Sequence, residues 1–187
     1  MGTEKALLSV GGKTLIDHAI AQARAISEDI LIVGPKETFS AYGRLVADVY
    51  KDCGPLGGIH AALARTQTNL NLMLAVDTPF ITKDFLVYLA DAARNNPQAV
   101  VTVPRTKDGL QPLCAIYHRS FLPVAEQALK EGRLKLDALF QPASTHLIDL
   151  ASDAMKQRGF SAAMFDNLNT REDYERVKRG QSRSAKP

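Results

Sequence analysis

The chain has 187 residues, of which 45% are hydrophobic and 23% are charged, and its formal net charge is +3. These values are typical of one globular domain and exclude a disordered chain. No basic stripe is interleaved with aromatic residues, and no apolar run is long enough to cross a bilayer. We therefore expect no nucleic-acid partner and no membrane partner. The cysteines, Cys53 and Cys114, lack the spacing of a metal site, which favours a reduced cytoplasmic protein.

Short β-branched segments alternate along the chain with segments of helical periodicity. The predicted strands span residues 29–34, 45–50, 70–76, 98–104, 113–118 and 145–150. The predicted helices span residues 15–26, 59–67, 83–96, 121–132 and 171–180. This order indicates an α/β fold with a mostly parallel central sheet covered on both faces, becoming mixed after about residue 105. We expect a single domain over residues 1–179 and a flexible tail over residues 180–187.

The chain opens with MGTEKALLSVGGKTLIDHAI, in which Gly11-Gly12 predicts a turn and the following residues predict a helix. Lys5 precedes this turn. A lysine in a loop near strand ends is suited to neutralising a phosphate, because its ammonium group is a point charge. Taken alone, however, a single lysine without further context is much more often an ordinary solvated surface side chain, and this interpretation of Lys5 is favoured at this point.

The segment LAVDTPFI at residues 74–81 places Asp77 directly after a fully apolar predicted strand. Ligands of open α/β sheets bind at the carboxyl ends of the strands, and Mg²⁺ is held there by one or two carboxylates together with substrate phosphates. The competing interpretation is that Asp77 caps the next helix. Thr82 is the better candidate for that cap, because it directly precedes the helical pattern.

The segment KDCGPLGGIHAAL at residues 51–63 predicts a tight glycine-rich loop between a strand and a helix. Exposed backbone N–H groups in such a loop suit an anionic or polar ligand, although many glycine-rich loops only connect elements. Asp52 precedes the glycines and is placed to accept hydrogen bonds from a base or ribose, or to help hold a metal. Gln111, in the segment GLQPLCAIY, and Asn169, in DNLNTREDY, are further polar candidates for ligand contacts.

The segments MGTEKALL, GGKTLIDHAI, DCGPLGGIHAAL, LAVDTPFI, QPLCAIY and NLNTREDY occur in the order found in molybdenum cofactor guanylyltransferases, and the resemblance covers residues 1 to about 178. It implies a Rossmann-like three-layer nucleotidyltransferase fold and transfer of GMP from GTP to molybdopterin, with Mg²⁺ and release of pyrophosphate. It also implies that proteins that deliver molybdopterin or mature molybdoenzymes are possible partners.

The resemblance carries over to individual residues. Gly2 and Lys5 match the Arg-Met-Gly-x-x-Lys segment that contacts phosphates, and Asp77 matches the aspartate that binds Mg²⁺ and the GTP phosphates. These matches imply that Lys5 and Asp77 are the catalytic residues. In this family an aspartate ahead of the GPLGG motif belongs to the GTP site, and Asp52 matches it.

The same resemblance places the Gly57-Gly58 pair against the guanine nucleotide. It implies that Gln111 and Asn169 lie on the molybdopterin side of the cleft.

The family begins with a strand and a Leu-Ala-Gly-Gly-x-Ser-x-Arg loop, and Met1-Gly2 align with the end of that loop. The resemblance therefore implies that the first strand is missing, and that the chain folds poorly or binds GTP weakly. Two other functions stay open at this point. One is cytidylyl transfer to molybdopterin or nucleotidyl transfer to a sugar phosphate, and the other is an inactive fragment or binding module.

Overall fold

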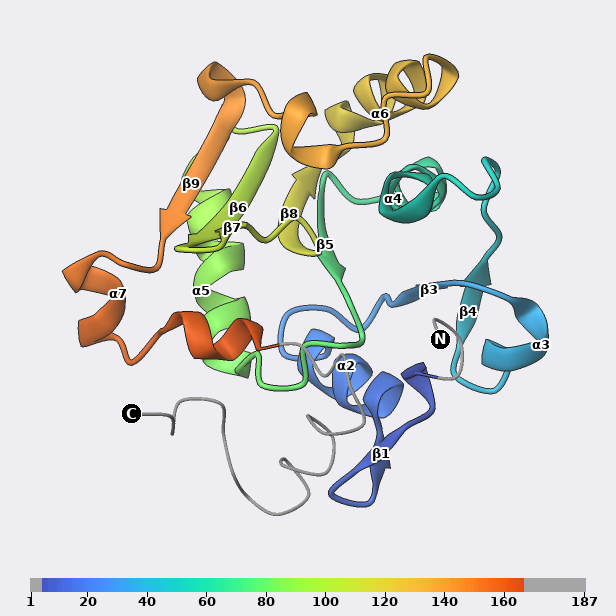
Figure 1. Ribbon diagram of the computed structural model, residues 1–187, viewed down its shortest axis with the longest axis horizontal. Coiled ribbons are helices and arrows are strands. Elements are labelled where there is room, and N and C mark those ends of the chain that lie inside the picture. Colours follow the sequence, from blue (N-terminus) through green and yellow to red (C-terminus); the bar gives the residue numbers. More distant parts are fainter. Residues whose placement is uncertain (1–4, 167–187) are drawn as a thin grey trace.

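The predicted alternation of strands and helices is confirmed by the computed structural model of the protein, which describes residues 5–166 (Figure 1). The α-helices are α2 (Leu15–Ala23), α3 (Lys36–Phe39), α4 (Gly54–Arg65), α5 (Lys83–Arg94), α6 (Leu122–Lys130) and α7 (Asp153–Gln157). The strands are β1 (Ser9–Val10), β2 (Lys13–Thr14), β3 (Leu31–Val33), β4 (Arg44–Val46), β5 (Leu70–Leu74), β6 (Val101–Thr106), β7 (Gly109–Leu110), β8 (Cys114–His118) and β9 (Thr145–Asp149). The predicted helix over residues 171–180 lies outside the described residues. Within residues 5–166, no helix is long and apolar enough to span a membrane.

The largest sheet is mixed, so the prediction of a mostly parallel central sheet is wrong for the described residues. Its strand order is β5-β8-β6-β7, with β9 on the other edge of β6. The pairs β5–β8, β6–β8 and β6–β7 are antiparallel, and only β6–β9 is parallel. For the β6–β7 pair the cause is local: residues 107–108 alone link these strands, and a parallel pair needs a crossover of a dozen or more residues.

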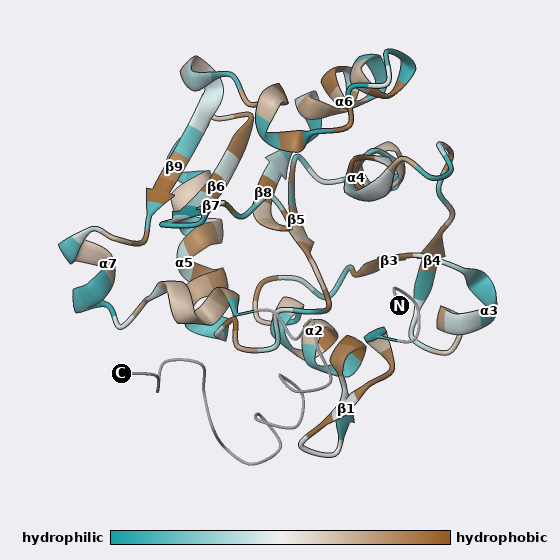
Figure 2. Cartoon of the chain, viewed as in Figure 1, coloured by the Kyte–Doolittle hydropathy of each residue, from teal (hydrophilic) through white to brown (hydrophobic). Residues whose placement is uncertain are grey.

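Helices cover both faces of this sheet, which confirms the predicted three layers. Val103 and Tyr117 face α4 and α6 in one apolar cluster, whereas Cys114 and Ile116 face α5 in another. The alternation along β8 follows the two-residue repeat of a strand. Figure 2 shows that β5, β6 and α5 carry apolar residues. Burial raises the pKa of the Cys114 thiol, as expected for a cysteine that packs rather than reacts.

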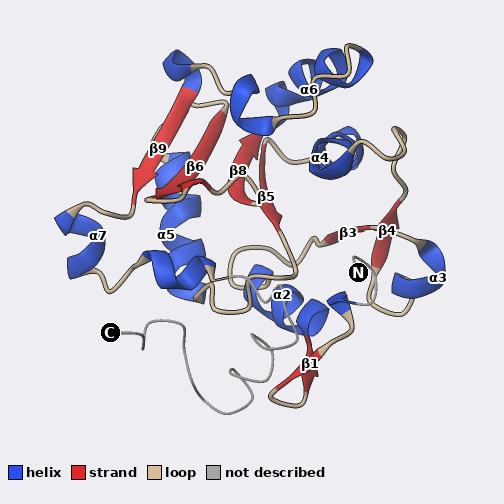
Figure 3. Cartoon of the chain, viewed as in Figure 1, coloured by secondary structure: helices blue, strands red, loops and turns tan. Residues whose placement is uncertain are grey.

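Strands β3 and β4 form a separate, parallel two-stranded sheet on the other side of β5 (Figure 3). Strands β1 and β2 form a small antiparallel hairpin. Gly11 and Gly12 close this hairpin with φ angles of 58° and 83°, a left-handed conformation that glycine adopts without steric cost. The predicted turn at these two residues is therefore confirmed.

Helix α4 begins at Gly54, five residues earlier than predicted, so the GPLGG segment forms helical turns rather than a loop. Pro55 fits there because the first turn of a helix does not need its missing N–H group. Gly57 is packed tightly: an added Cβ atom would lie 2.9 Å from the Tyr50 carbonyl oxygen. At Gly58, the nearest atoms to an added Cβ are Val33 Cγ1 at 3.6 Å and Asp48 Oδ1 at 4.0 Å, which are ordinary contacts.

These two glycines provide a matched test of the packing of α4. Both substitutions to alanine gain helix propensity, by up to about 1 kcal/mol. Gly57→Ala also overpacks the contact with the Tyr50 carbonyl, at a cost of about 1–3 kcal/mol. We expect urea unfolding to show that Gly57→Ala is less stable than the wild type and that Gly58→Ala is at least as stable. Equal unfolding free energies for the two variants would contradict the described position of the helix.

Candidate active site

Asp77 lies at the carboxyl end of β5, where the sequence places it. The strand ends at Leu74, and one further hydrogen bond, from Ala75 N to Leu113 O at 2.8 Å, extends its pairing with the β8 segment. The chain then turns, with the Thr78 hydroxyl donating to Ala75 O at 3.1 Å. Thr82 caps α5 by accepting from Phe85 N at 3.2 Å. Asp77 is therefore not the helix cap, and its carboxylate is left for another role.

Gln22 holds the loop that follows Asp77. This α2 side chain is only 8% exposed, and its Nε2 donates to Pro79 O at 2.9 Å and to Ile81 O at 2.6 Å. Both hydrogens of one amide group therefore bind carbonyls of the same loop. Because the loop is fixed at these two points, the backbone beyond Asp77 has a defined path against α2. No local pattern predicts this contact, since the partners are 57 and 59 residues apart.

Lys5 and Asp77 form an ion pair, with Lys5 Nζ 2.9 Å from Asp77 Oδ2. The side chains are 15% and 28% exposed, so the pair is shielded from much of the solvent. Coulomb attraction is stronger at such a site than between fully exposed charges. The structure thus brings together two residues 72 positions apart that were both expected at the phosphates. Their catalytic roles stay predictions.

A second carboxylate, Asp48, follows the neighbouring strand pair. Strand β4 ends at Val46, and Asp48 lines a groove together with Val33 and Gly58. Desolvation raises the pKa of Asp48 above its ordinary value. The sequence reasoning missed this residue because the strand was predicted to run to residue 50. The available signal was its position as the first acidic residue after the apolar pair Leu45-Val46.

Asp52, the carboxylate that the sequence favoured, lies in the exposed turn before α4. Its φ of 60° is left-handed, a conformation that aspartate tolerates better than most side chains. Next to it, Cys53 caps α4 without a side-chain hydrogen bond. The N–H groups of a first helical turn have no intrahelical partners and favour negative charge. The role of Asp52 in GTP binding stays a prediction.

Three predicted residues remain: Gln111, Gly2 and Asn169. Gln111 is anchored by its side chain, which donates to Thr106 Oγ1 at 3.2 Å, and it lies two residues before Leu113, the partner of Ala75. Gly2 and Asn169 lie outside the described residues.

The described residues 5–166 contain no group of three or more metal-ligating side chains. One carboxylate, that of Asp77, nevertheless fits Mg²⁺, because this ion keeps several water ligands and binds substrate phosphates.

An α/β domain with a lysine–aspartate pair and a helix N-terminus at its strand ends has the arrangement typical of nucleotide-binding domains. Residues 1–147 match the family model described as the MobA-like NTP transferase domain, and the chain belongs to this family. It is 32% identical to the molybdenum cofactor guanylyltransferase of Syntrophotalea carbinolica over 183 residues, which are 96% of this chain and 85% of that protein.

Solved structures show the same fold. The molybdopterin-guanine dinucleotide biosynthesis protein A of Archaeoglobus fulgidus is similar with a TM-score of 0.76 and 24% identity, over 94% of this chain and 89% of that chain. A Mycobacterium tuberculosis protein in complex with manganese is similar with a TM-score of 0.61 and 18% identity, over 95% of this chain and 92% of that chain.

The hydrogen bonds of Gln22 predict a graded stability series. Gln22→Leu leaves the carbonyls of Pro79 and Ile81 without their donor, which should lower the free energy of unfolding by about 1–3 kcal/mol. Gln22→Glu should cost more at neutral pH, because a carboxylate only accepts hydrogen bonds and would face two carbonyl oxygens. Urea unfolding measures both changes.

The matched control for this series is Gln67→Leu, an exposed position for which we expect a change within about 0.5 kcal/mol. Amide exchange over residues 77–81 should accelerate in the Gln22 variants and not in the control. If Gln22→Leu behaves like Gln67→Leu in both measurements, the loop is held by other contacts.

Proposed function

We propose that the protein transfers GMP from GTP to molybdopterin and releases pyrophosphate, in the synthesis of molybdopterin guanine dinucleotide. The observation that carries this proposal is the Lys5–Asp77 pair at the carboxyl end of β5, in a chain of the MobA-like family. The name of the Syntrophotalea carbinolica relative supports the choice of GTP and molybdopterin. The manganese in the Mycobacterium tuberculosis structure supports a divalent cation, for which we propose Mg²⁺.

The reaction forms one P–O bond and breaks another. A terminal phosphate oxygen of molybdopterin attacks the α-phosphorus of GTP in line, and the bond to pyrophosphate breaks as this leaving group departs. Asp77 would hold the Mg²⁺, and a bound Mg²⁺ supplies neutralisation of phosphate charge. Lys5 exchanges its contact with Asp77 for one with the phosphates, so both charges of the pair gain new partners. Positioning and charge neutralisation suffice for this chemistry, and no protein nucleophile is needed.

We further propose that the nucleotide base or ribose lies at the amino-terminal end of α4. Asp48 is the better supported carboxylate acceptor there, because it lines the groove beside Gly58, whereas Asp52 lies in the turn before α4 and does not line the groove. Gln111 and Asn169 are proposed to contact molybdopterin.

The direct test of the proposed function is pyrophosphate release with GTP, CTP and UTP, each offered with molybdopterin or a sugar phosphate. We expect release only with GTP and molybdopterin, and only when Mg²⁺ or Mn²⁺ is present. Strict dependence on CTP, or turnover with a sugar phosphate alone, would replace the guanylyl assignment by another nucleotidyl transfer. No turnover with any pair would identify the chain as a fragment or a binding module.

Substitution of the ion pair tests the two catalytic assignments. Asp77→Asn keeps the side-chain size and removes the charge that would hold the metal, so we expect kcat to fall about 100-fold or more. Lys5→Met should have an effect of similar size. The matched control is Asp84→Asn, which removes an exposed carboxylate from the first turn of α5 and should leave kcat unchanged. An Asp77→Asn protein with wild-type kcat would exclude a role for this carboxylate in the reaction.

We expect substitutions of the two carboxylates before α4 to weaken nucleotide binding to different extents. We expect Asp48→Asn to weaken GTP binding about tenfold, which corresponds to the loss of one hydrogen bond to a charged group. Asp52→Asn should weaken it less than about threefold, since this side chain does not line the groove. Titration calorimetry of GTP with Mg²⁺ measures both changes. If Asp52→Asn weakens GTP binding more than Asp48→Asn does, Asp52 is the residue that contacts GTP.

A further inference from the structure

Thr106, the last residue of β6, carries a buried hydroxyl that contacts both the β6–β7 turn and Gln111. The residue is only 8% exposed. Its Oγ1 donates to Gly109 O at 3.3 Å and accepts from Asp108 N at 3.2 Å. Gln111 Nε2 donates to the same oxygen at 3.2 Å. Because a hydroxyl has one proton to donate and two lone pairs that accept, these three hydrogen bonds saturate Thr106 Oγ1.

This network determines the orientation of the Gln111 amide. The carbonyl oxygen of Gly109 can only accept, so it takes the single proton of the Thr106 hydroxyl. The backbone N–H of Asp108 occupies one lone pair of that hydroxyl. The remaining lone pair requires a donor, which is the NH2 group of Gln111 and not its oxygen. The side chain therefore binds Thr106 through Nε2, and Oε1 is left for another partner.

Gln111 Oε1 is an acceptor that the protein itself does not use. Gln111 is half-buried, and its side-chain oxygen has no hydrogen-bond partner among residues 5–166. In the same part of the chain, the buried side-chain polar atoms without a partner belong to His60 and His146, so Gln111 Oε1 is not sealed in the interior. An amide oxygen held in one orientation is a preorganised acceptor for a donor group of a ligand.

The backbone around Gln111 is also held in place. Gln111 N donates to Pro104 O at 2.9 Å, which ties it to β6. The hydroxyl of the fully buried Tyr117 donates to Pro112 O at 2.9 Å. With the backbone fixed before and after this side chain, the contact with Thr106 is the one that decides the direction of the amide.

Gln111 lies at the same edge of the sheet as Asp77. Strands β5 and β6 are both antiparallel to β8, so they run in the same direction and their carboxyl ends lie at one edge. Just beyond the end of β5, Ala75 N donates to Leu113 O at 2.8 Å, and Gln111 is two residues before Leu113. The oriented amide therefore lies on the side of the sheet where the proposed reaction takes place.

We propose that Thr106 is a positioning residue for the acceptor substrate: its hydroxyl orients the Gln111 amide so that Oε1 accepts a hydrogen bond from an N–H group of the pterin. This inference rests on the proposed function, in which Gln111 contacts molybdopterin. A pterin has N–H donors on its ring and its amino group, whereas an ionised phosphate only accepts. An amide oxygen thus suits the pterin end of molybdopterin and not its phosphate end. Thr106 acts through Gln111 and does not contact the substrate.

The test measures the Kd of molybdopterin by titration calorimetry, which does not depend on turnover. Thr106→Val removes the hydroxyl with little change of shape and lets the amide rotate, so we expect the Kd to rise about tenfold, as for the loss of one hydrogen bond. The Kd of GTP should not change. Thr106→Ser keeps the hydroxyl and should bind molybdopterin as the wild type does. In 15N NMR spectra, the side-chain NH2 group of Gln111 should be rigid in the wild type and in Thr106→Ser, and mobile in Thr106→Val.

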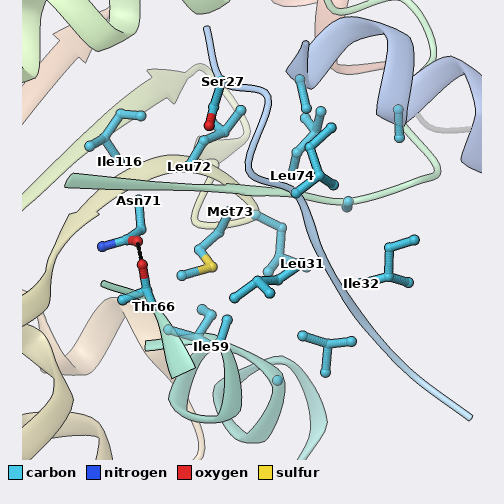
Figure 4. Close-up of a pocket in the computed structure, with 18 of the residues that line it drawn as sticks. Ser27, Leu31, Ile32, Ile59, Thr66, Asn71, Leu72, Met73, Leu74 and Ile116 are labelled. Atoms are coloured by element: carbon cyan, nitrogen blue, oxygen red, sulfur yellow. Dashed lines mark hydrogen bonds between the residues drawn. The ribbon is translucent and has the colours of Figure 1, made fainter. Parts of the chain in front are cut away.

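The matched control is Thr66→Val, because Thr66 is also a buried threonine, 7% exposed, whose hydroxyl binds an amide side chain. Its partner is Asn71, at the opposite end of β5 from Leu74 (Figure 4). Thr66→Val should lower the stability and leave the Kd of molybdopterin unchanged. A double variant tests whether Thr106 acts through Gln111. Once Gln111→Leu has removed the acceptor, Thr106→Val should have no further effect on this Kd.

Three results overturn the proposal: an unchanged Kd in Thr106→Val, additive effects in the double variant, or a wild-type protein that does not bind molybdopterin. If Thr106→Val does not fold, the wild-type spectrum decides, since a Gln111 amide as mobile as that of the exposed Gln67 overturns the proposal as well. The proposed function fails in a different way, when the wild type binds molybdopterin but transfers no GMP to it. The Kd series then still decides the role of Thr106.

Discussion

The position of Asp77 depends on the point at which β5 leaves the sheet. Antiparallel pairing with β8 holds β5 as far as Ala75, and the donor amide of Gln22 holds the loop again at Pro79 and Ile81. Between these two anchors only a few residues are free to move. Contacts before and after Asp77 in the chain therefore hold its carboxylate at the end of β5, where it forms the ion pair with Lys5.

Before substrates bind, Lys5 and Asp77 neutralise each other's charge. Lys5 and Asp77 are each mostly shielded from solvent, and each neutralises the other at 2.9 Å. A partly buried charge without a partner is costly, and in this pair each charge has its partner in the absence of ligand. A metal–triphosphate complex offers a cation to Asp77 and an anion to Lys5. Binding then exchanges one set of charge contacts for two others and leaves neither charge alone.

The sequence was a good guide where the pattern is local and long. The alternation of apolar segments predicted β5, β8 and β9 and the helices α2 and α5, and the apolar run before Asp77 located the site. It failed where distant contacts decide. The antiparallel pairing of β5 with β8 joins segments that are far apart in the sequence, and the partners of Gln22 lie more than 50 residues away. The start of α4 was missed because glycines predict a loop, whereas Pro55 permits a helix to begin there.

The most direct measurement of the central claim is a crystal structure with GTP and Mn²⁺, in which anomalous scattering locates the metal. We predict a manganese peak against the Asp77 carboxylate, with Lys5 Nζ moved from Asp77 to the phosphates. A metal bound elsewhere, with the Lys5–Asp77 pair intact and the nucleotide in place, would contradict the assignment of Asp77 as the metal ligand and of Lys5 as the phosphate lysine.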